Sequence, residues 1–139
     1  MKFRVMLDEG AILPRRAHPT DAGLDLFSRE EKTVPAHGSA AFDTGVHIEI
    51  PETCAGKLVS KSGLNVKHGI LSDGLIDAGY TGSITVKLYN LSNRDYTVLR
   101  GDKISQLVIF PVCLAGCEIT EALSDTERGA GGFGSTGRN

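Results

Sequence analysis

Acidic, basic and hydroxyl side chains are grouped with glycine at several places in this sequence, a pattern that suits sites for phosphate groups or a metal ion. In segment 21–26 (DAGLDL), two acids flank a glycine and Asp25 lies between two leucines. One interpretation is an aspartate in a turn that leads into a strand. The other is a carboxylate that holds a hydrated Mg²⁺, an ion that takes few protein ligands and keeps its waters.

Segment 60–64 (SKSGL) places two hydroxyl groups, an ammonium group and a glycine at the start of an expected short helix over 63–67. Free backbone N–H groups and the dipole at a helix start favour an anion. The same residues also fit an ordinary helix start with Ser62 as the N-cap. The segment by itself is therefore compatible with phosphate binding without requiring it.

Two further segments place polar residues beside apolar runs. In 74–82 (GLIDAGYTG), Asp77 precedes a glycine turn and Tyr80 follows three residues later. A strand–turn–strand of this kind can offer main-chain groups to a flat polar ligand, or its aspartate can simply stabilise the turn. In 100–107 (RGDKISQL), a turn precedes a buried strand in which Gln106 needs a structural or ligand partner.

The final segment, 128–139 (RGAGGFGSTGRN), carries Arg128 and Phe133 in a run rich in glycine. It has little to bury and much backbone entropy to lose, so it cannot pack a core. An arginine can grip phosphate and a phenyl ring can stack on a base, which predicts a lid that closes on a nucleotide. The alternative is a plain disordered tail. Glycines 129, 131 and 134 mimic a dinucleotide-binding fingerprint, but no strand and helix flank them as that motif requires.

Composition excludes several other classes. A chain of 139 residues with net charge −2 and pI near 6.1 predicts one domain and no general nucleic-acid binding. No apolar run reaches the ~20 residues that span a bilayer, and we expect no signal peptide because the first residues form no long apolar run and no cleavage site. An odd number of cysteines, three, fits reduced thiols in a cytoplasmic protein, and their spacing does not predict a zinc site.

Apolar residues alternate with a period of two, which predicts strands around residues 3–7, 46–50 and 84–88. The run 104–112 is more continuously apolar, as in a strand buried on both faces. Glycine, proline and aspartate interrupt the runs every eight to twelve residues, which favours an all-β sandwich or barrel with one short helix. We expect a β-rich domain over 1–125 and a C-terminal arm over 126–139.

Taken together and in this order, the five segments resemble the motifs of the trimeric dUTP pyrophosphatase (dUTPase) family. They are 21–28 (DAGLDLFS), 60–64 with Lys67, His68 and Gly69, 74–82, 100–107 and 128–137. The resemblance extends from about Ala11 to the C-terminus. It implies a β jelly roll that assembles as a homotrimer, with active sites completed by different subunits.

The resemblance also implies hydrolysis of dUTP to dUMP and pyrophosphate with Mg²⁺, which limits uracil in DNA and supplies dUMP for thymidylate synthesis. Asp77 matches the carboxylate that orients the attacking water, and Asp25 matches the one that holds Mg²⁺ through water. Tyr80 matches the ring beneath the deoxyribose that leaves no room for a 2′-hydroxyl. The remaining substrate contacts implied are Lys61, Ser62, Gly63 and Gln106 near the phosphates, Leu75, Ile76 and Thr85 at uracil, and Arg128, Phe133 and Gly134 in the arm.

The sequence departs from the family pattern at two places. Lys61 stands where arginine is usual, so the charge is kept but the bidentate fork is lost. The expected loop from His68 to Asp73 is short for the family. Two alternatives to a dUTPase are a dCTP deaminase of the same fold, which would need a further acid over the base, and a non-enzymatic nucleotide-binding or capsid-like trimer.

Overall fold

The structure is a computed structural model, and it describes residues 3–132. The chain is mostly β, and the predicted all-β jelly-roll class with one short helix is confirmed. In chain order the elements are β1 (Val5–Leu7), β2 (Gly23–Phe27), β3 (Lys32–Val34), β4 (Ser39–Asp43), β5 (Val46–Ile48), β6 (Cys54–Val59), α1 (Ser62–His68), β7 (Ile70–Ile76), β8 (Thr85–Asn90), β9 (Tyr96–Val98) and β10 (Lys103–Pro111).

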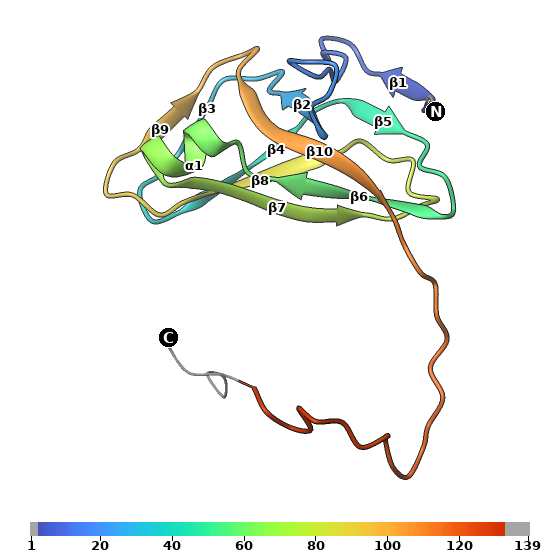
Figure 1. Cartoon of the computed structure of the whole chain (residues 1–139). Coiled ribbons are helices and arrows are strands. Elements are labelled where there is room, and N and C mark those ends of the chain that lie inside the picture. Colours follow the sequence, from blue (N-terminus) through green and yellow to red (C-terminus); the bar gives the residue numbers. More distant parts are fainter. Residues whose placement is uncertain (1–2, 133–139) are drawn as a thin grey trace.

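The largest sheet has six strands in the order β2-β10-β6-β7-β8-β4, and all its pairs are antiparallel. Two short ribbons, β1-β5 and β3-β9, complete the body (Figure 1). This order brings the ends of β2, β6 and β10 together, although they are distant in sequence. Three of the five motifs come from these ends.

The core lies between the curled sheet and the ribbons. Strand β8 illustrates how the strands contribute one face to it. Val86 and Leu88 are fully buried, while Lys87 between them and Tyr89 after them are exposed, so the period of two places one face inward. The core also takes in residues of every other strand region except β1, among them Leu26, Val34, Phe42, Val46, Leu58, Ile70, Val98 and Leu107.

Strand β10 confirms the predicted strand but not its uniform burial. Ile104, Ser105 and Leu107 in its first half are buried, whereas its second half is half-buried and Pro111 is exposed. Strand β1 forms as the alternation predicts, but Val5, Met6 and Leu7 are all exposed in the single chain. These apolar side chains are therefore available to contacts outside the chain's own core.

Two local predictions around the helix are wrong. The N-cap of α1 is Lys61, in extended conformation and without a side-chain capping bond, so Ser62 is the first helical residue. The expected loop from His68 to Asp73 does not exist, because Ile70 already begins β7. Gly69 makes this possible: its left-handed conformation, with φ of 66°, ends the helix and turns the chain directly into the strand.

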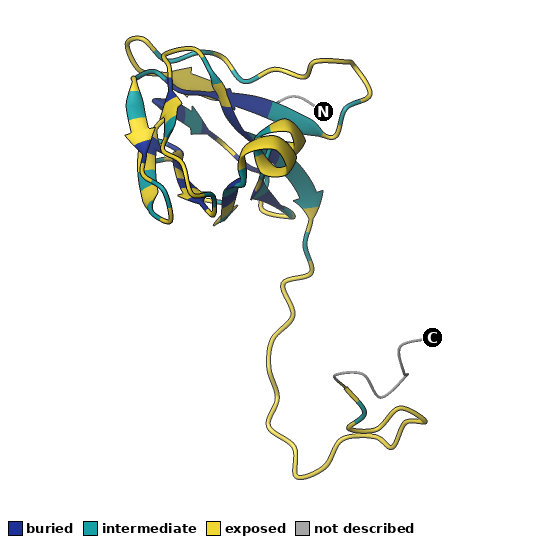
Figure 2. Cartoon of the chain, turned by 90° about the vertical axis from the view of Figure 1, so that its left-hand side faces the viewer, coloured by how far each residue is buried: buried dark blue, intermediate teal, exposed yellow. Residues whose placement is uncertain are grey.

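After β10, the chain leaves the body as an extended segment that crosses open space (Figures 1 and 2). Leu114, Ile119 and Leu123 in this segment are 81%, 100% and 87% exposed. The last strand ends at Pro111, and the expected domain boundary near residue 125 stays a prediction. Within residues 3–132, no helix is long and apolar enough to cross a bilayer.

Candidate active site

A slot opens where strands β7 and β8 separate. The two strands pair only from Ile70–Asn90 to Ser72–Leu88, and beyond that point the ladder stops. Residues 73–76 of β7 remain paired to β6 on their other side, and Thr85–Lys87 remain paired to β4. Both strands are thus held firmly while main-chain groups on their facing edges lie free of each other.

Five of the predicted site residues line a pocket of about 220 Å³ at the mouth of this slot: Leu75, Ile76, Asp77, Tyr80 and Thr85. Ile76 is buried, whereas Asp77 and Tyr80 are exposed. The pocket is therefore walled by a firmly paired strand and open to solvent at its acid. Such a shape accepts a flat ring, with a carboxylate positioned at the rim.

The position of Tyr80 depends on the glycine two residues later. The Tyr80 hydroxyl donates to the Ser83 carbonyl at 3.0 Å, so the ring folds back along the hairpin. A Cβ on Gly82 would lie 2.5 Å from the Tyr80 hydroxyl oxygen and 2.6 Å from the ring, closer than real contacts allow. Glycine at 82 is therefore required for the ring to lie where it does.

A second group of predicted residues surrounds Asp25 on β2. The Asp25 side chain is only 4% exposed, and such a charge is costly to bury unless it is paired. Lys61 donates a hydrogen bond to Oδ1, and Nζ of Lys103 lies 2.8 Å from Oδ2. Burial raises the pKa of the Asp25 carboxyl, but the contacts and charges of Lys103 and Lys61 outweigh it and hold the pKa below 3.8.

Among the described residues, Oδ2 of Asp25 is buried and its one polar contact is the ion pair with the Lys103 ammonium, which falls short of regular hydrogen-bond geometry. A carboxylate oxygen has more than one lone pair, so Oδ2 can still accept a hydrogen bond from a water of a hydrated Mg²⁺. No three His, Cys, Asp or Glu side chains within residues 3–132 gather as a protein-only metal centre would require. The residues present thus fit an ion that takes most of its ligands from water and phosphate.

Gln106 joins this group from β10, where it pairs in register with Asp25 on one side and Val59 on the other. Its amide donates to the Ser60 carbonyl at 3.2 Å, so the partner that its position in an apolar run demands is a main-chain group. A Cβ on Gly23 would meet the Gln106 side chain at 2.6 Å, and glycine there leaves room for it. Ser62 and Gly63 follow, exposed, at the start of α1.

The two groups lie at opposite ends of β6 within one chain. Ile76, which precedes Asp77, pairs with Gly56. At the other end, Val59 precedes segment 60–64 and pairs with Asp73 and Gln106. At about 3.3 Å per step along a strand, the four steps from Asp73 to Asp77 span about 13 Å. Within one chain the two groups are therefore separate, and no single phosphate-sized group could touch both.

Comparison with known proteins agrees with the resemblance. The family model described as dUTPase matches residues 9–137. The deoxyuridine 5'-triphosphate nucleotidohydrolase of Clostridium acetobutylicum is 46% identical over 134 residues, which cover 94% of this chain and 92% of that protein. This chain belongs to the dUTPase family.

Solved dUTPase structures share the fold over the same length. The dUTPase of Staphylococcus bacteriophage 80alpha, determined with dUpNHpp, superposes with a TM-score of 0.93 at 31% identity and covers 98% of each chain. The dUTPase of phage phi11 of S. aureus, described with a structural Mg(II) ion, matches with a TM-score of 0.83 at 29% identity, over 90% of this chain and 100% of that one.

The arm residues of this dUTPase are only partly described. Arg128 is exposed and donates from Nε to the Gly131 carbonyl at 2.9 Å, a contact within the arm itself. Phe133 and Gly134 lie outside the described residues. Their roles stay predictions.

Sequence reasoning did not single out Lys103, although it lies inside the fourth motif. The available signal was Asp25 itself, since a carboxylate between leucines on a buried strand requires a cation. Which lysines supply the charge depends on the pairing of β2 with β10 and on the turn after β6, and neither is visible in local sequence.

Proposed function

We propose that this dUTPase hydrolyses dUTP to dUMP and pyrophosphate, with uracil in the slot between β7 and β8. The observation that carries the proposal is the open ladder beyond Ser72–Leu88, with Asp77 and Tyr80 at its mouth. Uracil is flat and presents alternating acceptors and one donor along an edge. Main-chain groups of two separated strands can pair with such an edge as they would with another strand.

Selection against other nucleotides follows from the walls of the slot. Both strands are fixed by neighbouring strands, so the space cannot widen for a 5-methyl group, and a fixed hydrogen-bond pattern disfavours the amino group of cytosine. The Tyr80 ring, held by its bond to the Ser83 carbonyl, packs beneath the deoxyribose and leaves no room for a 2′-hydroxyl. Ribonucleotides are excluded by the same contact.

Asp77 orients the attacking water and accepts its proton. The residue is exposed immediately after β7, whose last residue Ile76 is buried, so the carboxylate sits on a fixed support beside the slot. Water held there is directed in line at the α-phosphorus of a nucleotide whose base fills the slot. General-base assistance of this kind is worth ~10²–10⁴-fold in rate.

The triphosphate lies against the group around Asp25. Lys61, Ser62, Gly63 and Gln106 contact phosphate oxygens, and Asp25 would hold Mg²⁺ through water with the acceptor capacity that Oδ2 keeps beside Lys103. When bound, Mg²⁺ neutralises phosphate charge and favours departure of pyrophosphate. The D95N mutant of the phi11 dUTPase, described with a structural Mg(II) ion, supports Mg²⁺ only as an ion that this fold can bind.

A homotrimer with shared active sites accommodates the separation of the two groups. The extended segment after β10 supports an exchange of arms, because its apolar residues Leu114, Ile119 and Leu123 are left uncovered in the single chain. In the assembly, the arm of a neighbouring copy closes the site. Arg128 then clamps the γ-phosphate, and Phe133, followed by Gly134, stacks over uracil.

In the cell, we propose a cytoplasmic enzyme that limits uracil in DNA and supplies dUMP for thymidylate synthesis, without binding nucleic acid or membrane. A net charge of −2 supports the last point, since nucleic-acid and membrane surfaces are anionic.

The experiment is pyrophosphate release by purified protein from dUTP, dTTP, dCTP and UTP, with Mg²⁺ and with EDTA. We expect turnover of dUTP alone and a large loss with EDTA. Asp77→Asn should bind dUpNHpp as the unchanged protein does and turn over about 10²–10⁴-fold more slowly. Normal turnover by that variant would defeat the proposed role of Asp77.

One matched control and one truncation complete the experiment. Asp73→Asn changes an aspartate of β7 that pairs with Lys57 on the surface, and it should leave kcat close to that of the unchanged protein. Protein lacking residues 126–139 should lose most of its kcat/KM while keeping its fold. Ammonia release from dCTP would instead favour the deaminase alternative.

A further inference from the structure

Few hydrogen bonds hold the hairpin between β7 and β8 from outside. Among the described residues, hydrogen bonds reach residues 78–83 from elsewhere at two points: His47 Nδ1 lies 2.8 Å from the Thr81 carbonyl oxygen, and Ser83 donates to Asp43. Ile84, just beyond, is tied by its own backbone N–H to the Val46 carbonyl at 2.8 Å. Of these, the bond from His47 is the one that reaches the tip next to Tyr80, while the other two hold the end of the hairpin near β8.

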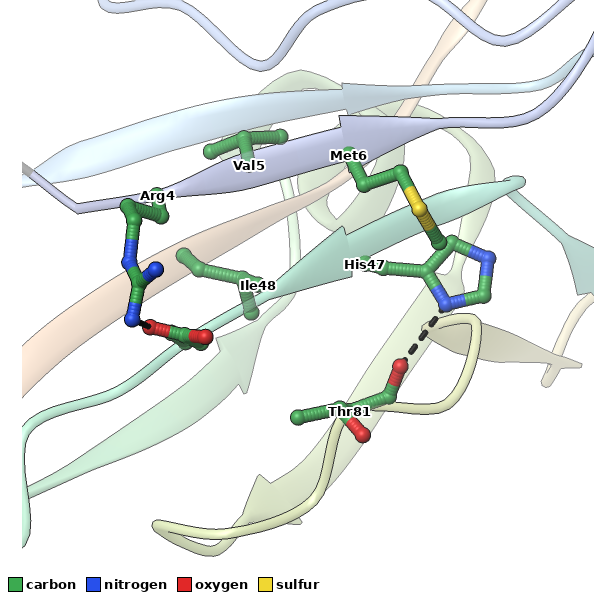
Figure 3. Close-up of a pocket in the computed structure, with 7 residues that line it drawn as sticks. Arg4, Val5, Met6, His47, Ile48 and Thr81 are labelled. Atoms are coloured by element: carbon green, nitrogen blue, oxygen red, sulfur yellow. Dashed lines mark hydrogen bonds and ion pairs between the residues drawn. The ribbon is translucent and has the colours of Figure 1, made fainter.

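His47 projects from β5 toward Thr81 across a pocket bordered by β1 (Figure 3). Its other ring nitrogen, Nε2, lies 3.1 Å from Asp8 Oδ1. A carbonyl oxygen and a carboxylate are both acceptors, so each ring nitrogen must carry a proton to satisfy its partner. A neutral imidazole has one N–H and can serve only one of the two. The arrangement therefore fits the imidazolium form.

The charges around this ring are mixed. Asp8 and Asp43 face it from the turn after β1 and from the end of β4, and Arg29 lies between them, 3.7 Å from Asp8 and paired with Asp43. Arg4, just before β1, and Glu49, just after β5, line the same pocket and pair with each other. The hydrogen bond to Thr81, followed by Asp8 and Asp43, raises the pKa of His47 above 6.5 despite the opposing effect of burial.

We propose that His47, as an imidazolium bridging Asp8 and the Thr81 carbonyl, is a positioning residue that holds Tyr80 in place beneath the sugar. The role rests on the proposed function of the slot. Loss of the proton frees one end of the bridge, and the hairpin tip then moves relative to β8. Substrate affinity, more than the chemical step at Asp77, depends on this contact.

The experiment combines two independent readouts on the full chain. The first is an NMR titration of ring nitrogens in ¹⁵N-histidine-labelled protein, assigned with His47→Gln. The second is the pH profile of KM and kcat for dUTP in unchanged protein, His47→Gln, Asp8→Asn and the exposed matched control His18→Gln.

We expect both His47 nitrogens to be protonated below a midpoint above pH 6.5, and KM of the unchanged protein to rise about three- to fivefold across that midpoint, the size of a single partly exposed charge-assisted contact. His47→Gln should show the higher KM at all pH values with kcat little changed, and Asp8→Asn should shift the midpoint down. His18→Gln should match the unchanged protein.

Two results would overturn the proposal. One is a His47 ring that titrates at or below pH 6.5. The other is a pH dependence of KM that persists unchanged in His47→Gln. If no variant, including the unchanged protein, hydrolyses dUTP, the proposed function fails, while the NMR titration still decides whether the bridge exists.

Discussion

Replacing Asp25 by asparagine tests whether the buried carboxylate organises the ends of β2, β6 and β10. The substitution keeps the shape but removes the charge that Lys61 and Lys103 share. The two ammonium groups then face each other across a neutral amide that retains one acceptor oxygen. We therefore expect a less stable protein.

The expected loss follows from the exposure of the partners. A hydrogen bond to a charged group contributes about 1.5–3 kcal/mol, and removing one partner of a buried pair costs at most about 3–5 kcal/mol. The lysine side chains are 25% and 44% exposed, so water screens both contacts and lets the ammonium groups turn outward. We expect a loss of about 2–3 kcal/mol, equal to about 6–12 °C in Tm for a chain of this length.

The dependence on pH has a defined sign. The carboxyl pKa is below 3.8 in the folded chain and close to that value when unfolded, so the unfolded chain binds the proton more readily. The stabilising effect is therefore complete above the unfolded pKa and is lost as pH falls through the folded pKa. The difference between unchanged protein and Asp25→Asn should be full near pH 7 and shrink below pH 3.8.

The assay is urea unfolding at several pH values and one fixed protein concentration, because assembly makes stability depend on concentration. Lys57→Met, which removes an exposed pair with Asp73, is the matched control and should change little. Equal stability of Asp25→Asn and unchanged protein at pH 7 would refute the reasoning. So would a difference that does not shrink in acid.

Three further predictions concern activity and stability. Lys61→Arg should equal or improve kcat/KM for dUTP, because arginine adds a fork that grips carboxylate or phosphate at two points; a tenfold drop would mean that the site is built differently. Tyr80→Ala should raise kcat/KM for UTP relative to dUTP by about tenfold or more, measured by pyrophosphate release, and an unchanged ratio would exclude the ring from sugar selection. Asn90→Ala should cost about 2–3 kcal/mol in urea unfolding, because Asn90 is buried and donates to the Val34 and Arg94 carbonyls; a loss under about 0.5 kcal/mol would contradict the network.

Strand positions were predictable where a local pattern reflects burial. Val86 and Leu88 alternate with exposed neighbours because a strand with one inward face imposes that period on its sequence. The same rule predicted β1 correctly as a strand, but its side chains are exposed and not part of the core. Alternation marks an apolar face without saying what covers it. The helix was predicted within one residue of its start, and the loop after it was wrong because Gly69 alone makes the turn.

The sequence by itself determined the all-β class, the order of the motifs and the residues able to do chemistry, because side-chain types and their spacing are local properties. Only the tertiary structure decided that Lys103 joins Lys61 at Asp25, that β7 and β8 separate past Ser72, and that His47 reaches Thr81. Each of these depends on which distant strands pair and in what register. That choice is made by burial summed over the whole core, and no segment of the sequence carries it alone.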